Sequence, residues 1–372
     1  MVQYNQLLVG LERLTDVLQG GLAMSDPSLA YIEDLLVRLL NTPSPTGDTE
    51  AAIALLEAEC QTLPVETRRN RKGALIIHVP GTDTSRQRLV TAHVDTLGGI
   101  VKEILPTGRL RLAKIGSYAW NTVEGEYCQV RTERGDLVSG TVILHNTSVH
   151  VNRDVATVER KDDNIEVVLD ANVQSKQDTE ALGIAVGDFV YWDPRVQVTP
   201  TGYIKSRHLD DKASVAVVFG ALQSILQSGK PLPYALNILI SNNEEIGYGG
   251  NSNIPPETVE YLAVDMGAIG DGLSTNEHCV SICAKDGSGP YHLGLRRHLV
   301  SLCRQHNIPH AVDIYPYYSS DASAAMLSGA DVVHGLIGPG VANSHAYERT
   351  HRDALKATYD LLMAYLYSPL QG

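Results

Sequence analysis

Residues 239–250 read Leu-Ile-Ser-Asn-Asn-Glu-Glu-Ile-Gly-Tyr-Gly-Gly, an apolar run that meets two adjacent acids and then a glycine-rich turn. The run before the acids has the composition of a buried strand. Glu244 and Glu245 are therefore expected at the end of a strand and not on the solvated surface of a helix. Two carboxylates in such a place indicate that something positive binds beside them.

Three more strand-like runs end in an acid or a histidine, and one predicted helix starts with two acids. The runs are residues 89–95, 261–265 and 343–345, and the helix start is residues 207–213. In open α/β sheets, ligands gather at the carboxyl ends of the strands. Together these stretches predict a metal site.

Helical and strand-like segments alternate along most of the chain. Such alternation predicts an α/β domain whose mixed, mostly parallel sheet is covered by helices on both faces. Helical patterns cover residues 1–25, 28–40, 49–63, 214–227, 294–306 and 353–367, and strand patterns cover residues 73–79, 88–94, 234–240, 261–264 and 332–337.

Residues 98–201 have a different sequence pattern. They consist of short segments in which apolar and polar residues alternate, rich in β-branched residues and separated by turns. They are predicted to form an inserted all-β domain, either a small barrel or a sandwich. The catalytic domain is then discontinuous and consists of residues 1–97 and 202–372.

The length, composition and net charge of the chain limit the classes of protein to which it can belong. A chain of 372 residues with 43% hydrophobic and 20% charged residues is typical of a globular protein with a large core. Its formal net charge of −13 argues against binding to nucleic acid or to an anionic membrane, because both need a basic face. A peptide or small-molecule substrate is expected instead.

The cysteines and the first residues indicate the compartment. Five scattered cysteines without a CxxC pair argue against a disulfide framework or a zinc knuckle, so we expect reduced thiols and a cytoplasmic protein. Residues 1–22 lack the pattern of an export signal, and no apolar run reaches the length of about 18 residues that spans a membrane.

The acids and histidines named above offer a complete ligand set for two metal ions. Imidazole nitrogen and carboxylate oxygen suit zinc, with cobalt and manganese as alternatives, and a two-metal site needs roughly five to six ligands, one of them shared. The predicted ligands are His93, Asp210, Glu245, Asp265 and His345, with Asp210 bridging the two ions.

The two glutamates are assigned different roles. Adjacent residues at a strand end point in opposite directions, so only one of them can readily bind a metal, and Glu244 is left as the general base. Asp95 lies two residues beyond His93 on the same strand face, and we expect it to assist catalysis by holding the other nitrogen of that imidazole.

Each of these residues also has a simpler alternative role. His93 could be an ordinary buried histidine, Asp210 and Asp211 could cap the following helix, and the two glutamates could form a turn. Spacing alone leaves competitors open, which are Asp271 for Asp265, and His334 or His351 for His345.

Five motifs resemble, in order, the metal-site motifs of the glutamyl/leucyl-type dinuclear metalloaminopeptidases (metallopeptidase family forty-two), whose best-known members form tetrahedral dodecamers. The motifs are Ala92-His93-Val94-Asp95-Thr96, His208-Leu209-Asp210-Asp211-Lys212-Ala213, Asn243-Glu244-Glu245-Ile246-Gly247, Val264-Asp265-Met266-Gly267 and Ser344-His345-Ala346-Tyr347-Glu348-Arg349-Thr350. The resemblance covers nearly the whole chain from about residue 28.

The resemblance implies that Asp210 bridges, that Glu244 is the base, and that His345 is a ligand in preference to His334. It also implies that residues 98–201 are a dimerisation domain and that the protein is a homo-oligomer, either a dimer or a dodecamer. Where the family has Gly-Thr-Asp-Ala, this chain has Ser319-Ser320-Asp321-Ala322, which makes Asp321 a candidate substrate-binding residue. The last motif also departs from the family, so substrate preference does not transfer.

The leading hypothesis is an exopeptidase that uses two metal ions to hydrolyse the first peptide bond of short peptides. The same metals could instead remove the acyl group from N-acylated amino acids or dipeptides, or the chain could be an inactive metal-bearing scaffold. A glycosidase with Glu244 and Glu245 as its carboxylate pair is a poor alternative, because adjacent carboxylates do not straddle a sugar bond at the roughly 5–9.5 Å that this chemistry requires.

Overall fold

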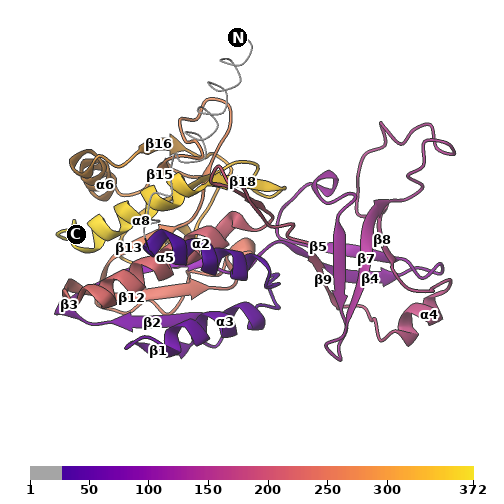
Figure 1. The fold of residues 1–372 in the computed structure, drawn as a ribbon, viewed down its shortest axis with the longest axis horizontal. Helices are drawn as coiled ribbons and strands as arrows, with labels where there is room; N and C mark the ends of the chain where they lie inside the picture. Colours follow the sequence, from indigo (N-terminus) through magenta and orange to yellow (C-terminus); the bar gives the residue numbers. More distant parts are fainter. Residues whose placement is uncertain (1–26) are drawn as a thin grey trace, which may run out of the picture.

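The computed structural model describes residues 27–372, so the helix expected at residues 1–25 lies outside the described part of the chain. Figure 1 shows a helix-covered sheet with a smaller barrel of strands standing beside it. The two parts correspond to the predicted α/β domain and the predicted all-β insertion.

The main sheet is mixed and mostly parallel, as predicted. It has nine strands, of which eight follow one another in the order β1-β2-β12-β3-β13-β17-β15-β16, and β14 pairs with β17. The four central neighbours β12, β3, β13 and β17 are all parallel. The strands are β1 Glu66–Arg69, β2 Leu75–Val79, β3 Gly81–His93, β12 Leu232–Ser241, β13 Thr258–Val264, β14 Gly267–Ala268, β15 Val280–Lys285, β16 His310–Ile314 and β17 Val333–Val341.

Helices cover both faces of this sheet. The larger core joins one face to α2, α3, α5, α6 and α8, and the smaller core joins the other face to α7. Helix α5 has an apolar sequence and is buried along most of its length, because it lies between the sheet and the helices α2 and α8. The helices are α2 Pro27–Leu40, α3 Glu50–Gln61, α5 Leu209–Ser228, α6 Leu293–His306, α7 Asp321–Leu327 and α8 Arg352–Leu366.

The inserted part is a closed antiparallel barrel with a core of its own. Its strand order is β4-β5-β8-β7-β6-β9, and a short helix α4 (Lys176–Ala181) and the 3-10 turn η1 (Trp120–Thr122) lie in its connections. The strands are β4 Gly98–Ile104, β5 Leu110–Ile115, β6 Tyr127–Arg131, β7 Leu137–Leu144, β8 Ile165–Leu169 and β9 Phe189–Trp192.

The chain returns from the barrel through a third, small sheet. The strand β10 (Gln197–Val198) pairs with β11 (Tyr203–Ser206), and β11 pairs with β18 (Glu348–His351) just before α8. The barrel strands therefore end at Trp192, somewhat before the predicted boundary at residue 201. Among the described helices, none combines the length and apolar character needed to cross a bilayer.

Candidate active site

Most of the predicted ligands lie at or just after the carboxyl ends of four neighbouring parallel strands, at one edge of the sheet. His93 is the last residue of β3, and Asp265 directly follows β13. His345 lies in the turn after β17, and Glu244 and Glu245 follow β12. Because the strands are parallel, their carboxyl ends meet at the same edge, as expected for an open α/β sheet.

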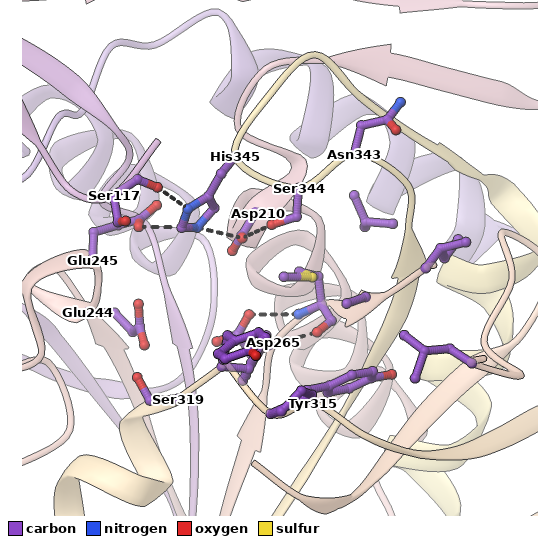
Figure 2. A pocket seen from close by; sticks show the side chains of 18 of the residues that line it. Ser117, Asp210, Glu244, Glu245, Asp265, Tyr315, Ser319, Asn343, Ser344 and His345 are labelled. Atoms are coloured by element: carbon purple, nitrogen blue, oxygen red, sulfur yellow. Dashed lines mark hydrogen bonds and ion pairs between the residues drawn. The ribbon is translucent and has the colours of Figure 1, made fainter. Parts of the chain in front are cut away.

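Asp210 lies between the two histidines, at the start of α5. Its Oδ1 is 3.2 Å from Nε2 of His93, and its Oδ2 is 3.5 Å from Nε2 of His345. The hydroxyl of Ser344 donates a hydrogen bond of 2.9 Å to the same Oδ2 (Figure 2). One carboxylate thus presents a different oxygen to each imidazole, which is the arrangement that a bridging ligand needs.

The tautomers of both imidazoles are set by main-chain carbonyl groups. Nδ1 of His93 donates to the main-chain oxygen of Asp95 at 2.9 Å, and Nδ1 of His345 donates to the main-chain oxygen of Ser117. In each neutral ring, Nε2 then carries a lone pair that faces a carboxylate oxygen of Asp210. Such a contact is repulsive unless a proton or a metal cation lies between the two atoms.

The two glutamates lie on a 3-10 turn, η2 (Glu244–Ile246), and not on the strand itself. The alternation of side chains along a strand therefore does not apply to these two residues, because a 3-10 turn rotates successive residues by a different angle. The side chains nevertheless diverge. Oε2 of Glu245 lies 3.6 Å from Nε2 of His345, whereas Oε2 of Glu244 lies 3.8 Å from Nε2 of His93.

Asp95 has a different role from the one expected. Its carboxylate Oδ1 is 3.6 Å from Nδ1 of His93, farther than its own main-chain oxygen, so the carbonyl and not the carboxylate holds the imidazole. The carboxylate instead accepts hydrogen bonds from the main-chain amides of Glu244 (3.1 Å) and Glu245 (3.3 Å), and from the hydroxyl of Thr46 (2.6 Å). Asp95 thereby fixes the turn that carries both glutamates.

The charges of the site fit divalent cations. Burial, and then the charge of Asp210, raises the pKa of Glu245 to about 8 and that of Asp265 to about 7. Burial alone would lower the pKa of His345, but the Asp210 and Glu245 carboxylates raise it to about 10. The carboxylates of this site outnumber its imidazoles, and two metal cations would balance the excess of negative charge.

Ligand-type atoms form two groups here, and each group has its atoms within 4.8 Å of one another. One contains His93, Asp210 and Glu245, and the other contains His93, Asp211 and Asp265. Oδ1 of Asp211 is buried and has no hydrogen-bond partner within residues 27–372. Asp211 was missed as a site residue, although its place beside Asp210 in the sequence was a usable signal.

Glu348 is a second residue that the sequence did not reveal. Its buried carboxylate accepts the main-chain amide of Asp210 at 3.1 Å and that of His345 at 3.2 Å, so it ties the two ligand-bearing segments together. Burial raises the pKa of this carboxyl well above its ordinary value. Its position three residues after His345 was the only available signal.

Asp321, the candidate substrate-binding residue, is not brought to the cavity. Its side chain is only 3% exposed and lies beneath the loop at Gly249 and Gly250. The carboxylate accepts hydrogen bonds from the hydroxyls of Ser241 and Thr91. Asp321 therefore lies beneath the site, and its carboxylate cannot contact a substrate in the cavity directly.

The competing residues lie elsewhere. Asp271 is exposed on a loop, and His334 stacks near Tyr291 with ring centroids 4.9 Å apart. His351 caps α8: its Nδ1 accepts the main-chain amide of Asp353 at 3.1 Å, and its Nε2 donates to the main-chain oxygen of Thr201. His351 also groups with His278 and Asp353, but the helix cap and these hydrogen bonds account for that group.

A cavity of about 590 Å³ opens beside the ligand set. Figure 2 shows Glu244, Glu245, Asp210 and His345 on one side of it and Tyr315 across from them. Ser117, which follows the barrel strand β5, also lines the cavity, so the barrel contributes to the wall of the site.

A mixed α/β sheet with an inserted barrel, and a buried carboxylate-imidazole set at its carboxyl edge, defines a metal-dependent exopeptidase. The sequence profile described as M42 glutamyl aminopeptidase matches residues 73–361, and the chain belongs to this family of metallo-exopeptidases. The predicted family and fold class are thereby confirmed.

Individual proteins resemble this chain in sequence or in fold. YhfE of Bacillus subtilis (strain 168) is 58% identical over 337 residues, which are 91% of this chain and 97% of that protein. The TET aminopeptidase from the marine archaeon Thaumarchaeota archaeon SCGC AB-539-E09 shares the fold, with a TM-score of 0.82, 18% identity, and coverage of 90% of this chain and 96% of that one. The TET1 peptidase of Pyrococcus horikoshii gives a TM-score of 0.80 at 20% identity, covering 91% and 100% of the two chains.

Proposed function

We propose that this protein uses two metal ions to remove the N-terminal residue from short peptides, with Glu244 as the general base. The observation that carries the proposal is the position of Asp210, whose two carboxylate oxygens face Nε2 of His93 and Nε2 of His345. A residue so placed can be shared by two cations, and the remaining acids divide between them.

The metal ligands follow from this arrangement. His93 and Asp265 would hold one divalent cation, Glu245 and His345 would hold the other, and Asp210 would lie between them. Zinc suits this donor set, and cobalt and manganese also do. Two such cations supply Lewis-acid chemistry, which activates water and polarises a carbonyl group.

Glu244 is the proposed residue that transfers a proton from the attacking water to the leaving amine. Its carboxylate lies beside the ligand set, 3.8 Å from His93, and lines the cavity where the peptide would enter. It accepts a proton from the attacking water and returns it to the amine that leaves when the peptide C–N bond breaks. Asp95 contributes by holding the main-chain amide of Glu244, and so sets the direction of that carboxylate.

Dipeptides with a free amine, compared with the same dipeptides carrying an N-acetyl group, test the proposed reaction. The protein is assayed after reconstitution with zinc, cobalt or manganese, and the chelated protein is the control. We expect hydrolysis of the free-amine peptides only. Faster hydrolysis of the N-acetyl compounds would show a deacylase, and no hydrolysis with any of the metals would indicate an inactive scaffold.

We also propose that the protein is a homo-oligomer built through its barrel. The TET1 peptidase of Pyrococcus horikoshii is described as assembling into a tetrahedron or a large octahedral shell. The barrel of this chain exposes the apolar side chains Tyr127, Leu137 and Val186, which contact between subunits would cover. Light scattering coupled to gel filtration is expected to give a dimer or a dodecamer, and a monomer at micromolar concentration would contradict the proposal.

A further inference from the structure

The cavity beside the ligand set is divided into a charged part and an apolar part. Each carboxylate that lines it belongs to the ligand set or is Glu244. Most of the remaining wall comes from the segment that follows Asp265, the segment that follows β16, and the end of β17, and Ser117, Gly247, Asn343 and Ser344 add uncharged groups. Its apolar members are Met266, Ala268, Ile269, Leu273, Tyr315, Pro316, Tyr318 and Val341.

The two inner tyrosines contribute rings and not free hydroxyl groups. The hydroxyl of Tyr315 lies 2.6 Å from Oγ of Ser281 and 3.0 Å from Oγ1 of Thr275, so it is bound within the sheet. The hydroxyl of Tyr318 donates to the main-chain oxygen of Met266 at 3.1 Å. The two ring centroids are 5.6 Å apart, and the rings together form an aromatic wall.

No charged group is available to a side chain that enters the apolar part. Lysine and arginine are absent from the described residues that line the cavity. Behind the wall, the carboxylate of Asp313 accepts the main-chain amides of Ser274 (2.9 Å) and Thr275 (2.7 Å) and the Thr275 hydroxyl. A glutamate side chain would find no cation there, and a lysine side chain would find no free acid.

We infer that the enzyme selects peptides whose N-terminal residue has an uncharged apolar or aromatic side chain, such as leucine or phenylalanine. This inference rests on the proposed aminopeptidase function. It departs from the glutamyl specificity in the description of the family, because a glutamyl enzyme needs a positive group for the substrate carboxylate. The apolar wall instead stabilises an apolar side chain by removing it from water.

The selectivity follows from the different free energies of burying an apolar and a charged substrate side chain in the apolar part of the cavity. An apolar side chain gains from burial against Leu273, Ile269 and the two rings, whereas a charged one loses its hydration and gains no partner. We expect kcat/KM for leucyl and phenylalanyl dipeptides to exceed that for glutamyl and lysyl dipeptides by about tenfold or more, in the range that apolar pockets achieve.

The test is a panel of dipeptides X-Ala, with X as Leu, Phe, Ala, Glu or Lys, assayed on the metal-reconstituted full chain. Higher kcat/KM for Leu and Phe supports the inference. Equal or higher values for Glu or Lys would overturn it while leaving the aminopeptidase proposal intact. Hydrolysis of none of the five peptides would instead refute the proposed function.

A charge placed in the apolar wall gives a second, independent readout. Leu273→Lys should raise kcat/KM for Glu-Ala relative to Leu-Ala by about tenfold or more, because the new cation pairs with the substrate carboxylate. The matched control is Leu327→Lys, on a side chain that is 80% exposed on α7 outside the cavity, and it should leave the ratio unchanged. If Leu273→Lys does not fold, Ile269→Lys takes its place. An unchanged ratio in a folded variant would contradict the inference.

Discussion

The carboxylate of Asp95 accepts a hydrogen bond of 3.1 Å from the main-chain amide of Glu244, and this contact joins the end of β3 to the turn that carries the proposed base. The main-chain oxygen of the same aspartate holds Nδ1 of His93. One residue therefore orients an imidazole through its backbone and a pair of glutamates through its side chain.

Asp95→Asn should lower kcat by about 10–100-fold, the usual cost of losing a residue that orients metal ligands. The amide group of asparagine can present only one acceptor oxygen to the two main-chain amides that the carboxylate now binds. The kcat is measured at saturating substrate, with metal content by elemental analysis. A kcat close to that of the wild type would show that the contact does not matter for catalysis.

His345→Ala should bind about one metal ion per chain where the wild type binds two, because His345 faces only one side of Asp210. His334→Ala is the matched control, since His334 lies beside Tyr291 and away from the ligand set, and it should keep both ions. Elemental analysis after dialysis against zinc measures the difference. Equal metal content in the two variants would contradict the ligand assignment.

Arg88 is predicted to stabilise the fold at a distance from the site. Its guanidinium is buried, lies 3.0 Å from the Glu260 carboxylate, and donates to the main-chain oxygens of Tyr365 and Leu366 at the end of α8. Arg88→Met should lower the free energy of unfolding by about 3–5 kcal/mol, because Glu260 is left buried without its partner.

Chemical denaturation of Arg88→Met measures this loss. The double variant Arg88→Met/Glu260→Gln should recover part of it, since no unpaired charge then remains in the core. A double variant no more stable than the single one would show that the loss comes mainly from the hydrogen bonds between the guanidinium and the end of α8.

The cysteines should be unreactive in the folded chain. All five are buried, and burial raises the pKa of Cys60, Cys128, Cys283 and Cys303 to about 12. At pH 8, Ellman's reagent should label no thiol in the native protein and five in guanidinium chloride. Labelling of the native protein would show that the core opens.

The same thiols make stability depend on pH in the alkaline range. Their ordinary pKa is 9.0, so between pH 9 and about 12 the unfolded chain releases protons that the folded chain retains. The stabilisation is fully present below pH 9 and is lost as the pH rises, and denaturation curves at pH 8 and pH 10.5 should show the decrease.

Much of this arrangement could be predicted because the signals are local. An apolar run that ends in an acid or histidine marks both a buried strand and its functional end, and His93 and Asp265 were found in this way. Strand β7 lies within the predicted β-rich insertion, and buried residues alternate with half-buried ones along its second half.

The remaining features depend on contacts between distant segments. The first half of β3, residues 81–87, is polar and mostly exposed, so it gave no strand signal. Glu348 acquires its role only when the turn after β17 meets the start of α5. Asp211 acquires its role only when the same helix start meets the end of β3 at His93. The burial of Asp321 likewise depends on the loop at Gly249 and Gly250 folding over it.

The central claim is that Glu244 moves the proton while the neighbouring Glu245 binds metal, and Glu244→Gln tests it most directly. Glutamine keeps the size of the side chain but cannot accept the proton as a carboxylate does. The measurement is kcat on a good dipeptide substrate together with metal content per chain. We predict that both metal ions remain while kcat falls by about 10²-fold or more. Turnover near that of the wild type, or loss of metal with loss of activity, would contradict the account.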